Sequence, residues 1–167
     1  KTGSLAQLPS RWRRAQLRAL SAAPITAGVD CVAGPLDDAS VRYIRTTDIE
    51  GLYRLTRKGE AVGVPWSVAA EALVYRDDIL LTRSGSLGTA LHYRSDEPAS
   101  YAGYLVRVRP DRKRIEPRYL GWWAISQDHL DQIAMGATRS TIDNFSASKF
   151  RAMRVPLPPL NDQVAIA

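Results

Sequence analysis

The stretch Asp77-Asp-Ile-Leu-Leu-Thr-Arg-Ser-Gly-Ser-Leu-Gly88 contains a turn signal, a short apolar run and a glycine-rich loop in direct succession. Paired aspartates favour a turn, and the apolar run at 79–81 has the length of a buried strand. The glycines permit a tight loop, and the following Thr89–Tyr93 is again typical of a strand. The stretch therefore predicts two strands joined by a glycine-rich loop.

Further strands are predicted on both sides of this pair. Val41-Arg-Tyr-Ile-Arg-Thr-Thr47 is rich in β-branched and aromatic residues, and Asp48–Gly51 is expected to close it with a turn. Gly103–Arg109 alternates in the same way, with Tyr104, Val106 and Val108 on one side. Gly28–Ser40 has the composition of a loop, and Pro9–Ala23 favours a short strand or helix. The first two-thirds of the chain is thus expected to be strand-rich.

Helices are predicted mainly in the last third. One long helix is expected from Pro117 to Gly136, since proline is favoured at the first helical position and glycine at the end. Its apolar residues recur at helical spacing: Leu120, Trp123, Leu130, Ile133 and Ala134.

The remaining segments alternate between helical and extended patterns. Ser146 or Ser148 is expected to cap a short helix through Phe150 and Met153. Val155–Pro159 must be extended because it is rich in proline, and Asn161 is expected to cap a helix that starts at Asp162. Ser67–Leu73 has room for one or two helical turns. The predicted fold class is α+β, a β-rich mixed domain with a long helix in its last third.

Composition indicates a folded domain with an anionic partner. The 167 residues are expected to form one domain, or one domain plus an appendage, and 45% of them are hydrophobic. The 23 Lys and Arg against 17 Asp and Glu give a net charge of +6, which favours nucleic acid or an acidic membrane surface. Nineteen of the basic residues are arginine, which suits phosphate and guanine edges but also arises from genomic base bias. They gather in three separated islands, at positions 11–18, 42–58 and 107–118.

Several functional classes find no support in the sequence. No apolar run approaches the roughly 18 residues of a membrane span. The single Cys31 cannot form an internal disulfide, so a reducing, cytoplasmic setting is expected. His92 and His129 have no second ligand at metal spacing, and the Gly85–Gly88 loop lacks hydrolase and phosphate-loop spacing. Pro158-Pro159 lies between leucines, without the polar and stacking residues of a base-modifying methyltransferase. A non-catalytic domain without a metal is expected.

Four segments occur in an order that resembles one known family. They are Tyr43-Ile-Arg-Thr-Thr-Asp-Ile49, Asp78–Gly88, Gly136-Ala-Thr-Arg-Ser-Thr-Ile142 and Val155-Pro-Leu-Pro-Pro-Leu-Asn-Asp-Gln163. Together with the opening Leu8-Pro-Ser-Arg-Trp12, they resemble the target recognition domain of type I restriction–modification specificity subunits. The resemblance spans residues 8–167. It departs from the family at Asp162, where glutamate is common, and residues 52–76 match no family motif.

The resemblance implies a fold and a set of partners. It implies a β-rich recognition domain at 8–159, preceded by a flank at 1–7 and followed by the start of a conserved spacer helix at 160–167. Two such domains normally read the two halves of a split double-stranded DNA site. They recruit modification subunits, which transfer a methyl group from S-adenosylmethionine to adenine, and restriction subunits. The recognition domain itself would be non-catalytic and bind no cofactor.

Two polar loops are the main candidates for DNA contact. Arg83, Ser84 and Ser86 offer donors to phosphates from a loop that glycines allow to approach closely, although an ordinary hairpin turn explains the same residues. In the second loop, Arg139 suits guanine and Asn144 suits adenine, with Ser140 and Thr141 between them. A capping loop before the next helix is the alternative there.

Further candidates lie at a strand end and in the unmatched region. They are Arg45, Thr46 and Thr47, and then Arg54, Arg57 and Lys58, with Trp66 nearby. Trp12, Trp122 and Trp123 are interpreted as packing residues instead.

Three alternative functions remain at this point. The chain could be the recognition module of a single-chain restriction–methyltransferase, or a half-length specificity subunit that dimerises. A third alternative is a protein-interaction module that uses Pro156–Pro159 as an extended ligand.

Overall fold

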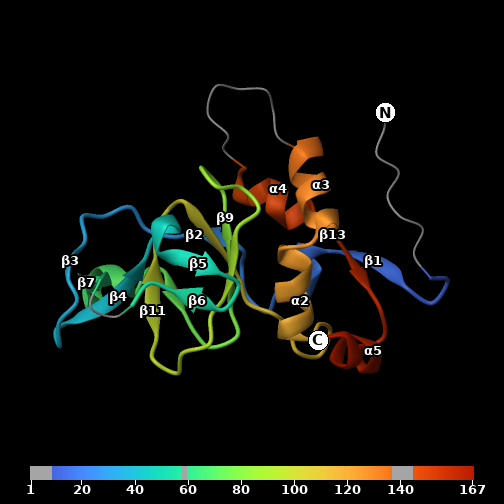
Figure 1. The fold of residues 1–167 in the computed structure, drawn as a ribbon, viewed down its shortest axis with the longest axis horizontal. Coiled ribbons are helices and arrows are strands. Elements are labelled where there is room, and N and C mark those ends of the chain that lie inside the picture. The colour runs from blue at the N-terminus through green and yellow to red at the C-terminus, as the bar shows by residue number, and fades with distance from the viewer. Residues whose placement is uncertain (1–8, 58–59, 137–144) are drawn as a thin grey trace.

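The computed structural model describes residues 9–57, 60–136 and 145–167. It is a mixed α+β fold, which confirms the predicted fold class (Figure 1). A four-stranded sheet has the order β10-β9-β12-β2, and a five-stranded sheet has the order β3-β7-β4-β11-β8. Two further strand pairs, β1-β13 and β5-β6, complete the β structure of the described residues. The strands are β1 (Arg13–Gln16), β2 (Thr26–Ala27), β3 (Gly34–Pro35), β4 (Ser40–Ile44), β5 (Ile49–Gly51), β6 (Arg54–Leu55), β7 (Val62–Pro65), β8 (Leu73–Val74), β9 (Ile79–Thr82), β10 (Ala90–His92), β11 (Ala99–Tyr101), β12 (Leu105–Val108) and β13 (Arg154–Leu157).

The stretch 77–93 forms the predicted pair of strands joined by a glycine-rich loop. β9 and β10 pair antiparallel, with Leu81 opposite Ala90, and all four residues of β9 are buried. β9 also pairs antiparallel with β12, so it is an interior strand of its sheet. β11 was not predicted, because three residues are too few to show a strand period.

The predicted strand over 41–47 is too long. β4 ends at Ile44, and Thr46–Asp48 forms a 3₁₀ turn, η2. The buried Asp48 carboxylate accepts a hydrogen bond from the Arg45 backbone amide at 2.8 Å, and this interaction bends the chain away from the sheet. The turn predicted at 48–51 is also wrong, since residues 49–51 form β5 and pair with β6.

The long helix predicted from Pro117 to Gly136 is two helices, α2 (Pro117–Ala124) and α3 (Gln127–Gly136). Ser126 breaks it: its hydroxyl donates to the Trp123 carbonyl at 2.7 Å, and the buried His129 side chain contacts the Ala124 carbonyl at 2.6 Å. The change of direction leaves Leu130 and Ala134 exposed, contrary to the predicted apolar face. Trp123 is buried as predicted and Trp12 is half-buried. Trp122 is 46% exposed and not part of the core, but it packs edge-on against Tyr53, with ring centroids 5.9 Å apart, so it makes the inter-element contact that was the other half of the prediction.

The shorter helices follow the sequence signals more closely. α1 (Trp66–Ala69) is a single turn, and Ser146 caps α4 (Ala147–Ala152) by accepting from the Lys149 amide. α5 (Leu160–Ile166) begins after Pro159, so Asn161 lies inside the helix and is not its cap. No described helix is long and apolar enough to cross a membrane.

The Val155–Pro159 segment is extended as predicted, but it is not an available ligand. β13 pairs with β1, and Val155, Pro156, Leu157 and Pro158 are buried. The Pro156 carbonyl accepts a hydrogen bond from the Tyr119 hydroxyl at 2.7 Å. The interpretation of this segment as an extended ligand for another protein is therefore wrong, since the segment is already part of the core.

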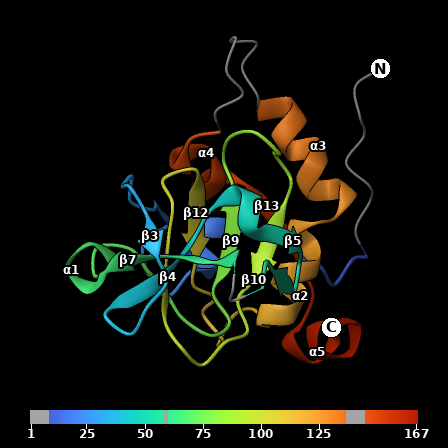
Figure 2. The same cartoon turned by 60° about the vertical axis from the view of Figure 1, so that its left-hand side comes forward.

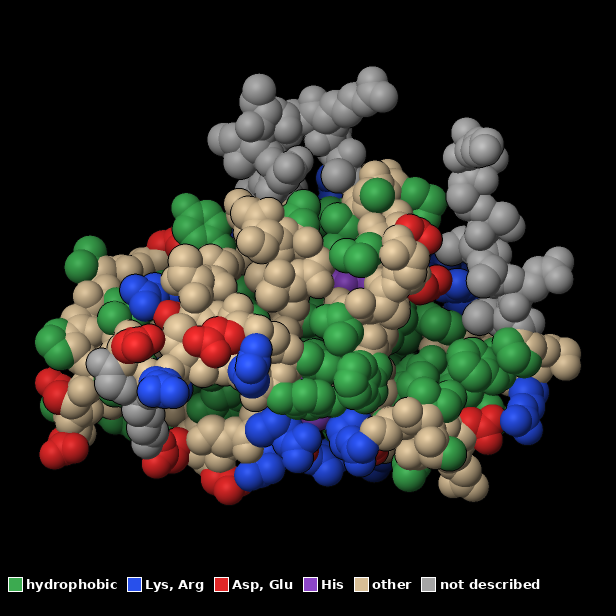
Figure 3. Space-filling view, viewed as in Figure 1, with side chains coloured by type: hydrophobic (Ala, Val, Ile, Leu, Met, Phe, Trp, Pro, Cys, Tyr) green, Lys and Arg blue, Asp and Glu red, His purple; other side chains and the backbone are tan. Residues whose placement is uncertain are grey.

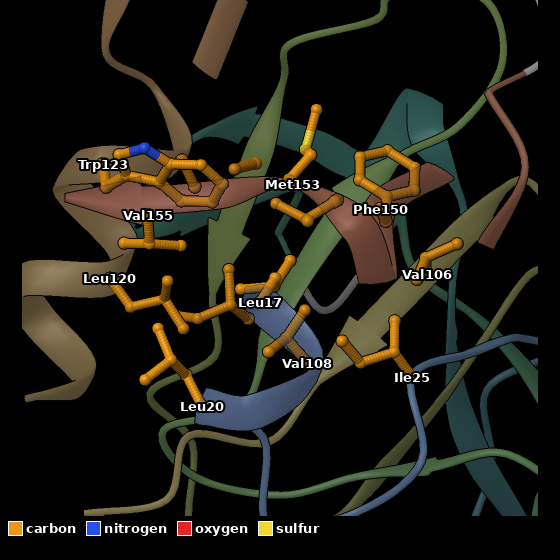
Figure 4. Packing of buried hydrophobic residues seen from close by; sticks show 14 of the residues in the cluster. Leu17, Leu20, Ile25, Val106, Val108, Leu120, Trp123, Phe150, Met153 and Val155 are labelled. Carbon is orange, nitrogen blue, oxygen red and sulfur yellow. The ribbon is translucent and has the colours of Figure 1, made fainter. Parts of the chain in front are cut away.

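The hydrophobic core joins the N-terminal segment to the last third of the chain. Figure 4 shows Leu17 and Leu20 from η1 (Leu17–Leu20) facing Trp123, Phe150 and Val155, with Val106 and Val108 of the four-stranded sheet beside them. A second cluster packs between the two larger sheets. Figure 2 shows α2, α3 and α5 gathered on one side of the sheets and the β3–β7–β4 region on the other. We call the group of η1, β1, β13 and α2–α5 the helical layer.

Candidate functional site

Two of the predicted contact segments meet at the turn Ala102–Leu105, which links β11 to β12. The Ala102 amide donates to the Ile44 carbonyl at 2.9 Å, so the turn lies directly beside the start of the Arg45–Asp48 segment. The Arg83 amide donates to the Tyr104 carbonyl, also at 2.9 Å. The strand ends thus bring together segments that are almost 40 residues apart in sequence. We call Arg45–Asp48, Arg83–Gly88 and the Ala102–Leu105 turn the loop cluster.

The Arg83–Gly88 segment is a well-fixed hairpin loop. Gly85 and Gly88 have φ of +73° and +90°, a region that glycine enters without strain. The Thr82 hydroxyl donates to the Ser86 carbonyl at 2.7 Å, and the Arg83 guanidinium donates to the Gly103 carbonyl at 3.3 Å. Arg83 and Ser84 are half-buried and Ser86 is exposed. The hairpin alternative is correct as a description of the backbone, and the seryl groups stay accessible for contact.

The Arg45–Thr47 segment is held by a carboxylate. The Asp48 side chain accepts from the Arg45 guanidinium at 3.0 and 2.7 Å, and these hydrogen bonds raise the pKa of Arg45. The Arg45 side chain is still 40% exposed, while Asp48 is buried. Thr46 is half-buried and Thr47 is exposed. Asp48 thus orients the guanidinium at the edge of the loop cluster and offsets part of its charge.

Arg54 and Arg57 are exposed on the segment that runs back from β6 alongside β4. The Thr56 amide donates to the Asp48 carbonyl at 2.9 Å, and the Thr56 carbonyl accepts from Arg42 at 2.6 Å. These bonds place the two arginines on the flank of the loop cluster. Trp66, on α1, is 51% exposed.

Five of the predicted contact residues lie outside the described residues: Lys58, Arg139, Ser140, Thr141 and Asn144. Phe145, the first described residue after 144, donates its amide to the Arg83 carbonyl at 2.7 Å. The chain thus emerges from this segment beside the Arg83–Gly88 loop.

One residue of the loop cluster was missed at the sequence level. Tyr104 was placed on the apolar face of a strand, yet β12 begins at Leu105 and Tyr104 is 60% exposed. The available signal was Gly103, since a glycine before an apolar run favours a turn.

The three basic islands do not form one positive face. Many of their arginines are tied internally: Arg14 to Asp128, Arg109 to Asp78, Arg112 to Asp77 and Arg107 to the Leu73 carbonyl. Figure 3 shows Lys and Arg in separate patches on the visible face, interspersed with acidic side chains. Most of the arginine excess in these islands therefore has a structural role.

Buried histidines and carboxylates do not form a reactive centre among the described residues. His92 is fully buried and contacts Asp77 at 2.8 Å, and burial lowers its pKa despite that partner. Asp111 and Lys113 have an acid-x-Lys spacing seen in nucleases, but Asp111 accepts from the Lys113 amide and pairs with Arg114. No group of three His, Cys, Asp or Glu side chains in the described ranges could hold a metal ion.

Comparison with known proteins agrees with this architecture. No family model matches the chain. A curated relative, the type I restriction enzyme StySPI specificity subunit of Salmonella potsdam, is 24% identical over 169 residues, covering 96% of this chain and 36% of the relative. This chain thus spans little more than a third of the length of that relative.

Solved structures share the fold at low identity. A structure described as the basis of complex assembly and conformational transition of the type I R-M system superposes with a TM-score of 0.70 at 18% identity, over 96% of this chain and 37% of that one. The HsdS subunit from Thermoanaerobacter tengcongensis gives 0.64 at 17% identity, over 96% and 36%. The S subunit from M. genitalium gives 0.62 at 15% identity, over 96% and 38%. The chain therefore shares the fold of the matched third of these subunits, and the expected resemblance to type I restriction–modification specificity subunits is confirmed.

Proposed function

We propose that this chain recognises one half of a bipartite double-stranded DNA target on behalf of a type I specificity subunit. The observation that carries the proposal is the convergence of Arg45–Thr47 and Arg83–Ser86 at one turn. Each segment is weak evidence by itself, because strand-end arginines and hairpin loops are common. Together they form a polar surface on a rigid backbone, which is what phosphate contacts and base-edge contacts require.

The partners follow from the same proposal. Modification subunits would use S-adenosylmethionine to methylate adenine at the site that this domain selects, and restriction subunits would join them in the cytoplasm. The domain would supply only recognition, in agreement with relatives that are specificity subunits.

Binding of labelled duplex DNA across a salt series tests the proposal. Each phosphate contact releases counterions, so the logarithm of the binding constant should fall linearly with the logarithm of salt concentration, by about 0.9 per contact. One recognition domain is expected to bind weakly at physiological salt, because it reads only half of the target. Binding that does not change between low and high salt would contradict the proposal.

A further inference from the structure

Tyr104 is the most exposed aromatic side chain of the described residues, and it lies within the loop cluster. It is 60% exposed, whereas Tyr101, three residues earlier, is fully buried. Single exposed aromatic residues are common on protein surfaces and need no special explanation. The position of Tyr104 and the rigidity of its backbone are what distinguish it.

The backbone around Tyr104 is held from four directions. The Ala102 amide donates to Ile44, and the Gly103 amide donates to the Val29 carbonyl at 3.0 Å. The Leu105 amide closes the turn onto Ala102 at 2.9 Å, and the Tyr104 carbonyl accepts from Arg83. The side chain is therefore presented from a turn that has little freedom to move.

Close packing below the turn fixes it further. A Cβ atom at Gly103 would lie 2.2 Å from a carboxylate oxygen of Asp30, so no larger residue fits there without a shift. At Gly28 a Cβ atom would lie 2.0 Å from the Tyr101 carbonyl oxygen. The crossing at Gly28 therefore depends on glycine, because the neighbouring atom belongs to the backbone of the strand that leads into the Tyr104 turn. At Gly103 the neighbour is the exposed Asp30 side chain, which can turn away.

The chemistry of Tyr104 suits contact with a base. A tyrosine has only two side-chain torsions, so placing it in an interface costs little conformational entropy. Its ring offers apolar contact to a thymine methyl group, and its hydroxyl is both a donor and an acceptor for hydrogen bonds. The flanking Arg83 and Arg45 segments carry the groups that would contact phosphates on either side.

From this geometry we infer that Tyr104 is a specificity-determining residue that contacts a base pair of the DNA target. The inference rests on the proposed function and extends it, because it assigns base reading to a residue between the two positioning segments. A solvated tyrosine with no role would leave target choice unchanged when it is removed.

Sequencing of methylated DNA tests this inference in cells that carry the full-length specificity subunit with its modification subunits. Tyr104→Ala is expected to relax the methylated sequence at one position of one half-site, where discrimination should fall about 5- to 150-fold. The other half-site should be unchanged. Tyr104→Phe tests which part of the side chain contacts the base. If the ring makes the contact, the methylated DNA sequence of this variant is the same as that of the wild type. Tyr75→Ala is the matched control, because Tyr75 is also an exposed tyrosine but lies before the start of β9, whereas the Arg83–Gly88 loop of the loop cluster follows the end of that strand.

Different results of this experiment would overturn the inference and the proposed function. An unchanged methylated sequence for a folded Tyr104→Ala subunit overturns the inference, as does an even loss of methylation at all sequences without relaxation. If the wild-type system methylates no defined sequence, the proposed function fails first. Thermal unfolding of Tyr104→Ala and Tyr104→Phe confirms that each variant is folded.

Discussion

The loop cluster and the helical layer differ in which groups they bury and which they expose. In the helical layer, large side chains such as Phe150, Leu17 and Leu120 are almost fully buried, and polar groups are tied to one another. In the loop cluster, the backbone is fixed by hydrogen bonds while Thr47, Ser86 and Tyr104 face solvent. The first region should therefore govern stability, and the second should govern binding with little effect on stability.

The largest effect is expected from Phe150, which has no exposed surface and packs edge-on against Phe145 with ring centroids 4.7 Å apart. Phe150→Ala should lower the free energy of unfolding by about 4 kcal/mol, because burial is lost and a cavity remains. Urea denaturation measures this directly. Trp122→Ala, on the exposed side of α2, should cost far less; equal losses would show that the helical layer is not a packed core.

A second effect concerns pH and His129. Burial lowers the pKa of His129 to about 4, and its neighbours Trp123 and Phe150 are aromatic. The folded protein favours the neutral form of His129. The contribution of this histidine to stability is therefore fully present above pH 6.5, the ordinary pKa of histidine. It is lost as pH falls toward 4 because the unfolded chain binds the proton first.

Between pH 7 and pH 5 this histidine alone should lower the free energy of unfolding by about 2 kcal/mol. His92, whose pKa is also lowered by burial, adds a change in the same direction. Denaturant titrations at the two pH values measure the sum, and His129→Gln should reduce the difference. A variant with the same pH dependence as the wild type would rule out this role for His129.

A third effect tests the backbone of the loop cluster. Gly88 has φ of +90°, and a Cβ atom there would lie 2.3 Å from the Leu130 side chain, so Gly88→Ala should cost about 2 kcal/mol. Gly85→Ala is the matched control, since Gly85 also has positive φ but nothing lies near its Cβ position. It should cost about 1 kcal/mol from conformation alone. If Gly85→Ala costs more than Gly88→Ala in thermal unfolding, the closeness of Leu130 does not restrict the side chain at position 88.

The sequence predicted the parts that depend on local pattern. The β9–β10 hairpin, the Ser146 cap and the extended Val155–Leu157 segment follow from short-range signals. The break between α2 and α3 could not be predicted, because the 3.6-residue period continues through Ile125 and Ser126. The break comes from the Ser126 hydroxyl, which donates to the Trp123 carbonyl, and from the His129 side chain, which contacts the Ala124 carbonyl. The second contact forms because His129 is buried, and that burial depends on the tertiary fold.

The sequence predicted individual residues of the candidate site better than it predicted which of them lie close together. Arg83, Ser86 and Thr47 are polar residues at predicted strand ends, so their candidacy was visible in the sequence. Their convergence depends on the turn at Ala102–Leu105, which pairs with segments far away in the chain. Tyr104 was missed for the same reason, since alternation alone assigned it to a buried strand face.

The smallest effect on stability is expected at the flank of the loop cluster. Arg54 and Arg57 are exposed, so replacing both by alanine should change the free energy of unfolding by less than about 0.5 kcal/mol each. If both contact phosphates, the slope of log binding constant against log salt should become shallower by about 1.8. Arg18→Ala is the control, because Arg18 is an exposed arginine on η1 in the helical layer. A shallower slope for Arg18→Ala and an unchanged slope for the double variant would move the DNA-binding surface from the loop cluster to the helical layer.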